Sequence, residues 1–184
     1  MNQSKADSTI IKEFRLIRTL SGKTPKIHKD AFVSEFAYLV GDVEVGAYSS
    51  IWPGVVIRGD SGKIKIGENT CVQDNSVIHG DADVEICDFV VIGHRVMCHA
   101  AVINNYVLLG NGSVVNDGVI IGEESIIGSG AMVVENMKIA KNSLVLGVPG
   151  RVKGEVKERH LELIKFTSKH YVEKGKLYKS EGLI

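Results

Sequence analysis

Two histidines stand five residues apart in the segment IGHRVMCH at 92–99, His94 and His99, and a third, His79, closes an earlier apolar run. Imidazole is a common ligand of transition metals and moves protons near neutral pH. A spacing of five separates two side chains on a helix by more than a third of a turn and puts them on opposite faces of a strand. A simple two-histidine metal site within one segment is therefore excluded, and the way the chain folds back on itself must explain the pair.

The elements that position these histidines follow a repeat of six residues. Units such as IGENTC, VQDNSV, LGNGSV, IGEESI and IGSGAM begin with an aliphatic residue, often continue with glycine, and carry a small residue at the fifth position. Sustained self-similarity of this kind outranks local assignments of helix or strand. The residues that open the units are Leu39, Val45, Ile51, Ile57, Ile66, Val72, Ile78, Ile92, Cys98, Ile103, Leu109, Val115, Ile121, Ile127 and Val133.

A six-residue period predicts a parallel β-helix. Three units wrap once around a triangular prism, the opening residue of each unit points inward, and glycines and small residues occupy the tight corners. We expect an N-terminal arm and cap over 1–24, the β-helix over 25–152, and a C-terminal helix and tail over 153–184. The helix is predicted because VKERHLELIKFTSKHYVEK contains neither proline nor glycine and places Val156, Leu163, Ile164 and Tyr171 at helical spacing.

The register of the repeat groups the histidines. His79 follows the inward Ile78 and His99 follows the inward Cys98, and the interval between them is one coil of 18 residues plus two, which a bulge at a corner can absorb. The two imidazoles are then expected to stack one strand spacing apart, near enough to share a metal ion. The side chain of His94 points outward from a different part of the prism and cannot easily reach the same ion. A neighbouring chain in a three-fold assembly would therefore have to supply the third histidine ligand. Three neutral imidazoles with an open fourth position lower the pKa of zinc-bound water to about 7. Register alone leaves ordinary surface histidines as an equal alternative.

Composition excludes several classes of function. The 22 basic and 22 acidic residues balance, and no basic stripe with interleaved aromatic residues is present, so nucleic acid is not an expected partner. No stretch approaches the roughly 18 apolar residues of a membrane span, and the first residues lack the apolar run of a signal peptide, so we expect a cytoplasmic protein without membrane contact. Three cysteines without a CxxC spacing predict neither a disulfide framework nor a cysteine zinc site.

Four motifs resemble those of the γ-class carbonic anhydrases and the related ferripyochelin-binding proteins. They are VIRGD at 56–60, VQDNSVIHG at 72–80, IGHRVMCHAA at 92–101 and LVLGVPGRV at 144–152, in this order within hexapeptide repeats. The resemblance implies a left-handed parallel β-helix, a homotrimer, and one zinc or iron ion at each subunit interface. It implies His79 and His99 as ligands from one chain and His94 as the ligand from its neighbour. The activity implied is hydration of CO2 to bicarbonate by a metal hydroxide.

The resemblance also implies roles for neighbouring polar residues. Arg58 and Asp60 match an interface ion pair near the metal. Gln73 matches the residue that hydrogen-bonds the metal-bound water or bicarbonate, and its second-position placement is expected to stack it near the two histidines, although a corner amide that satisfies a turn is equally compatible with the sequence. Asp74 either orients a neighbour or forms an Asx turn, and the turn is slightly favoured.

The chain departs from the best-studied kind of family member in its acidic groups. That kind carries an acidic insertion after the first histidine, whereas this chain has only GDADVEICDF, and Ser61 follows RGD where that kind has a glutamate. Fast proton export is therefore not expected, although Asp81, Asp83 and Glu85 lie near the right place. Two other functions stay open: a non-catalytic metal-binding or scaffold protein, and a hexapeptide acyltransferase, which would use one histidine as a general base.

Overall fold

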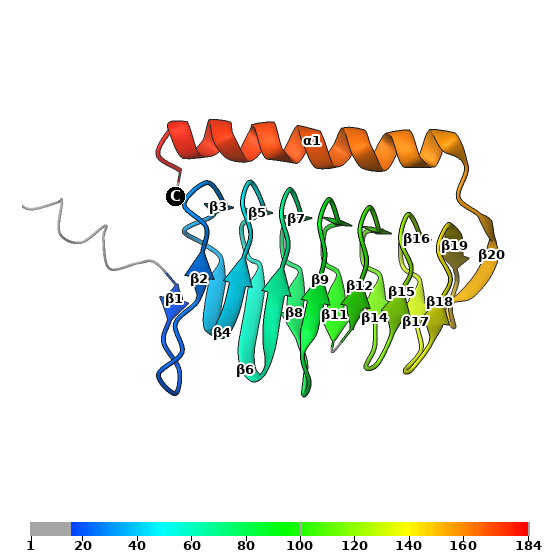
Figure 1. Cartoon of the computed structure of the whole chain (residues 1–184), viewed down its shortest axis with the longest axis horizontal. Helices are drawn as coiled ribbons and strands as arrows, with labels where there is room; N and C mark the ends of the chain where they lie inside the picture. The colour runs from blue at the N-terminus through cyan, green and yellow to red at the C-terminus, as the bar shows by residue number, and fades with distance from the viewer. Residues whose placement is uncertain (1–15, 100, 184) are drawn as a thin grey trace, which may run out of the picture.

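A computed structural model describes residues 16–99 and 101–183 as a left-handed parallel β-helix with one long helix, α1 (Glu158–Ser180), along its side (Figure 1). The prism has three faces. The first face consists of β1 (Ile17–Arg18), the start of β4 (Tyr38–Val45), the start of β6 (Val56–Ile66), β8 (Val77–His79), β11 (Met97–His99), β14 (Val114–Val115) and β17 (Met132–Val133).

The other two faces complete each coil. The second face consists of β2 (Lys26–Ile27), the ends of β4 and β6, β9 (Val84–Ile86), β12 (Val102–Ile103), β15 (Ile120–Ile121) and β18 (Lys138–Ile139). The third face consists of β3 (Phe32–Val33), β5 (Ser50–Ile51), β7 (Cys71–Val72), β10 (Val91–Ile92), β13 (Leu108–Leu109), β16 (Ile126–Ile127), β19 (Ser143–Leu146) and the antiparallel β20 (Arg151–Glu155). Of the predicted arm and cap at 1–24, residues 1–15 lie outside the described residues, and β1 pairs in parallel with β4.

The core is the column of inward-facing side chains. All fifteen residues predicted to point inward are buried, and most of them have no exposed surface at all. Each packs against the equivalent residue of a neighbouring coil, because parallel pairing keeps them in register, as in Ile92 against Leu109. The predicted repeat is thus confirmed.

The corners repeat with the same period. From Tyr106 to Asn142 a residue with positive φ occurs every six positions. Glycine provides this conformation without steric cost, as expected from the sequence, but several of these corners are formed by larger side chains instead. The seven positions are Tyr106, Gly112, Gly118, Glu124, Gly130, Asn136 and Asn142.

Three corners next to the predicted histidine pair depart from the six-residue step. The corner between Ile57 and Ile66 is three residues longer than a regular unit, and the corner between Ile78 and Ile86 is two residues longer. The latter is the bulge that the sequence required, and it lies between β8 and β9 as predicted. The step from Cys98 to Ile103 is one residue shorter. The irregularities are confined to loops, and the inward column continues past them.

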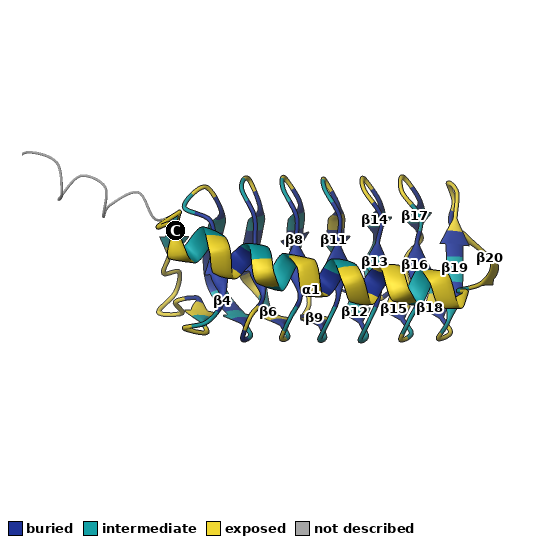
Figure 2. Ribbon diagram, turned by 90° about the horizontal axis from the view of Figure 1, so that it is seen from above, coloured by how far each residue is buried: buried dark blue, intermediate teal, exposed yellow. Residues whose placement is uncertain are grey.

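Helix α1 covers the third face. It runs back along the whole prism, with its buried side against the strands and its outer side exposed (Figure 2). Ile164 is fully buried, and Trp52 of the β-helix meets Tyr171 with ring centroids 5.3 Å apart. Leu163, which the spacing placed on the packed side, is 52% exposed, and that part of the prediction is wrong. Within the described residues, no helix has the length and apolarity needed to cross a bilayer.

The buried column gives the first prediction. Ile78→Ala removes a side chain with no exposed surface and leaves a cavity, so we expect the free energy of unfolding to fall by about 2–5 kcal/mol. Ile120→Ala is the matched control, because Ile120 points outward from β15 and is 39% exposed. Denaturant titration of both variants measures the difference, and an equal loss at both positions would contradict the assignment of the core.

Candidate metal centre

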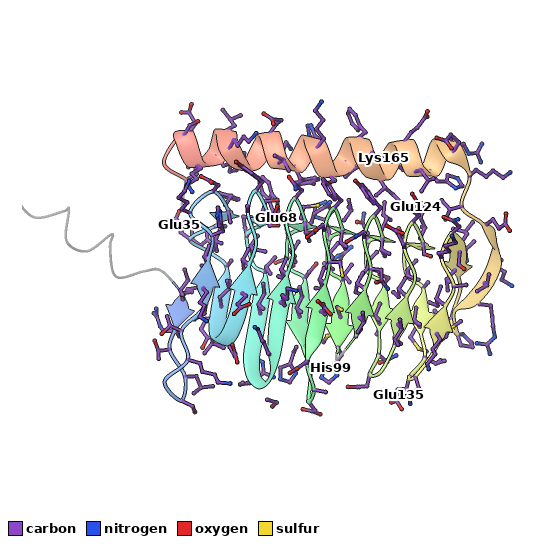
Figure 3. The ribbon with its side chains drawn as sticks, in the orientation of Figure 1. Glu35, Glu68, His99, Glu124, Glu135 and Lys165 are labelled. Carbon is purple, nitrogen blue, oxygen red and sulfur yellow. The ribbon has the colours of Figure 1, made fainter. Side chains whose placement is uncertain are left out.

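His79 and His99 lie side by side at the corner between the first and second faces. They are register partners on the adjacent strands β8 and β11, which confirms the stacking expected from the sequence. Their ring centroids are 5.1 Å apart, and Nδ1 of His79 lies 3.2 Å from Nε2 of His99. Figure 3 shows His99 on the side of the β-helix away from α1. The helix therefore leaves this corner free.

A carboxylate holds the other ring nitrogen of each histidine. Nε2 of His79 lies 2.8 Å from Oδ1 of Asp60, and Nδ1 of His99 lies 2.7 Å from Oδ1 of Asp117. Burial alone would raise the pKa of Asp60, but the hydrogen bond from His79 and the charge of Arg58 outweigh it and hold that pKa below its usual value. Since a carboxylate can only accept, each neutral imidazole carries its proton on the nitrogen that faces the aspartate.

In this tautomer the two nitrogens that face each other both present a lone pair. Two acceptors at 3.2 Å repel unless a cation lies against them. Two nitrogens bound to a tetrahedral zinc ion, each about 2.0–2.1 Å from it, lie about 3.3 Å apart. The donor types, their separation and the carboxylate behind each ring all fit a metal ion of this kind. A proton shared between the rings would also relieve the repulsion, and metal binding distinguishes the two.

His94 lies at a different corner. It sits in the turn between β10 and β11, five residues before His99, and the strand between them separates the two sites by about 15 Å. Its Nδ1 lies 3.1 Å from Oδ2 of Asp74, so this histidine also has a carboxylate partner, and its side chain is 44% exposed. Within 16–99 and 101–183, no three His, Cys, Asp or Glu side chains come together as a metal site.

Gln73 lies at the His94 corner. The expectation that it stacks near His79 and His99 is wrong, because Val72 pairs with Ile92, which places Gln73 beside Gly93 and one unit before His79. Gln73 is buried, and its Nε2 lies 3.8 Å from Sγ of Cys71. Its assignment to bound water or bicarbonate stays a prediction, and it now belongs with His94.

Arg58 continues the histidine ladder on β6. It is the register partner of His79, and its Nη1 lies 2.9 Å from Oδ2 of Asp60. The ion pair therefore forms within one chain, and the same carboxylate serves both Arg58 and His79. Asp60 also lines a polar cavity of about 300 Å3.

The three acids considered for proton transfer do not contact the histidines. Asp83 accepts a hydrogen bond from the backbone N–H of Lys63, Glu85 pairs with Lys65, and Asp81 is exposed. Asp117, by contrast, was not identified from the sequence. It follows His99 by 18 residues, which is the length of one regular coil, and this spacing is the signal that could have revealed it.

Comparisons with known proteins identify the family of the chain. A family model described as "Bacterial transferase hexapeptide (six repeats)" matches residues 24–59 and 100–134. A "Probable carbonic anhydrase" of Methanocaldococcus jannaschii is 51% identical over 148 residues, which is 79% of this chain and 93% of the relative. A "Carbonic anhydrase" of Geobacillus kaustophilus is 39% identical over 90% of this chain and 92% of its own length. The chain belongs to a carbonic anhydrase family of hexapeptide-repeat proteins.

Solved structures that share this fold include proteins described by a different activity. A Bacillus cereus protein described as a putative acetyltransferase has a TM-score of 0.86 and 38% sequence identity, covering 89% of this chain and 96% of its own. Members of one fold can host unrelated reactions, so the fold does not choose between hydration and acyl transfer. The chemistry of the histidine corner has to make that choice.

The facing nitrogens give the second prediction. We expect the chain to bind one Zn2+ or Co2+ per chain, and His79→Ala or His99→Ala to weaken binding by more than about 100-fold, because each removes a direct ligand. Chelator competition measures the affinity. His170→Ala on the outer side of α1 is the control and should bind as the unaltered chain does. Equal affinity in all variants would show that the pair shares a proton and not a metal.

Proposed function

We propose that the chain catalyses the reversible hydration of CO2 to bicarbonate at a metal ion held by His79 and His99 together with His94 of another copy. The observation that carries the proposal is the pair of ring nitrogens that face each other 3.2 Å apart, each on a ring whose other nitrogen contacts an aspartate. The names of the relatives support the reaction, and the donor set supports the ion.

A second copy is needed because two nitrogens do not complete a catalytic zinc site, which takes three protein ligands and one open position. The surface between the two corners is suited to such a contact. The outward side chains of the first face form an apolar stripe of Val56, Val77, Met97, Val114 and Met132, and Met97 is 38% exposed. Packing this face against another copy, in a closed three-fold ring, would bring a His94 corner to a His79 and His99 corner.

A bound zinc or iron ion would supply Lewis-acid activation of water for addition to CO2. The chain's own residues prepare the position. Asp60 and Asp117 keep the ring protons of His79 and His99 away from the ion, and Asp74 does the same for His94. Arg58 stabilises the Asp60 carboxylate that His79 requires. Gln73, at the His94 corner, would reach the ion from the neighbouring copy as a hydrogen-bond partner of substrate or water.

Turnover is proposed to be slow. Export of a proton at each cycle needs an acceptor near the ion, and the acids at the adjacent corner are engaged elsewhere or point to solvent. Ser61, in place of a glutamate, cannot accept a proton near neutral pH. Buffer molecules would have to accept the proton instead.

Acyl transfer is the second candidate, supported by the name of the Bacillus cereus structure. Such a reaction needs one histidine as a general base beside an acceptor hydroxyl or amine. That mechanism does not use three histidines that each contact an aspartate, nor two histidines whose ring nitrogens face each other. Stabilisation of the chain by coenzyme A in a thermal-shift measurement, with no CO2 hydration, would favour acyl transfer.

The direct test is stopped-flow CO2 hydration by protein loaded separately with zinc and with iron. We expect activity in the unaltered chain and its loss in His94→Ala, because His94 completes the ligand set. Full metal binding without hydration would favour the non-catalytic alternative.

A complementation experiment tests the sharing between copies, and it is the third prediction. His94→Ala and His79→Ala chains are each expected to be inactive alone. Co-expressed in equal amounts, they should regain about one quarter of the activity, because one interface in four pairs the intact His79 and His99 of the first chain with the intact His94 of the second. A mixture as inactive as its components would contradict the shared site.

A further inference from the structure

We infer that Asp117 is a positioning residue that sets the metal affinity of the centre through His99. The inference rests on the proposed function, since it concerns the same ion. Oδ1 of Asp117 lies 2.7 Å from Nδ1 of His99, the shortest of the four histidine–carboxylate contacts among the described residues. A contact of this kind fixes the ring orientation and makes the facing nitrogen a better donor to a metal.

The backbone holds Asp117 in place from both sides. Asn116 donates from its side-chain amide to the carbonyl of Val133 at 2.8 Å, and the carbonyl of Asp117 accepts from the N–H of Asn136 at 2.7 Å. Gly118 follows with φ of 66°, which closes the corner tightly. These contacts hold the Asp117 carboxylate just after the end of β14, one coil beyond His99.

Asp117 differs from Asp60 in its surroundings. The charge of Asp60 is shared between His79 and Arg58, and its side chain is 23% exposed. Among the described residues, His99 is the one side chain with which Asp117 forms a hydrogen bond or ion pair. Although the Asp117 side chain is 48% exposed, its negative charge is directed at a single imidazole, that of His99. We therefore expect the loss of this charge to be felt strongly at the metal.

Three variants distinguish the effect of the Asp117–His99 contact from the effect of negative charge at this corner in general. Asp117→Asn keeps the shape and an acceptor but removes the charge, and Asp117→Ala removes both. Glu135→Gln is the matched control, because Glu135 lies 18 residues after Asp117 at the same corner and is exposed. Figure 3 shows His99 and Glu135 on the same side of the β-helix.

The readouts are the Zn2+ affinity by chelator competition, the visible spectrum of the Co2+ form, and the ring 15N chemical shifts of His99 in the metal-free protein. This is the fourth prediction: Asp117→Asn weakens binding by about 10- to 100-fold and shifts the Co2+ spectrum. Asp117→Ala weakens binding at least as much and no longer fixes the ring proton on Nδ1 of His99. Glu135→Gln binds within about twofold of the unaltered chain.

The outcomes identify which idea fails. If the unaltered chain binds zinc through His79 and His99 but Asp117→Asn binds equally well, or if Glu135→Gln loses as much affinity, the role of Asp117 is overturned and the proposed function stands. If the unaltered chain binds no zinc at the pair, the proposed function is overturned. Circular dichroism of each variant shows that the β-helix is intact, and the ring shifts test the contact even without metal.

Discussion

Parallel backbone pairing between successive coils is the constraint on which the rest of the molecule depends. It sets equivalent residues of neighbouring coils about 4.8 Å apart along the prism. The inward column is continuous because of it, and Arg58, His79 and His99 form an outward ladder for the same reason. A functional group at one position of a coil is thereby brought beside the group at the equivalent position of the next coil, without any tertiary contact of its own.

Much of this was accessible from the sequence. The six-residue period identified the inward residues, and the count from Ile78 to Cys98 required the bulge that the structure has between β8 and β9. The period also brought His79 and His99 together and placed His94 at a distance. These predictions succeeded because backbone geometry alone determines them.

Other features depend on details that a period does not encode. Gln73 was assigned to the wrong corner because position within a unit was taken as position around the prism, although successive units occupy successive faces. Leu163 was expected to pack because helical spacing defines a stripe but not its width, and only Ile164 next to it is buried. Asp117 was missed because its role depends on a side-chain contact across one coil. The metal, the three-fold assembly and the reaction depend on groups outside one chain, and they stay predictions.

The corner between Ile78 and Ile86 has a consequence for how such proteins diversify. Its two extra residues are accommodated as a loop, and the hydrogen-bonded rungs on either side keep their register. Length at this corner is therefore nearly independent of ligand geometry. Residues, acidic ones included, can therefore be added to or removed from this corner while His79 and His99 stay fixed. In the proposed function, the supply of proton acceptors and the capacity to hold a metal would then be able to change separately in one scaffold.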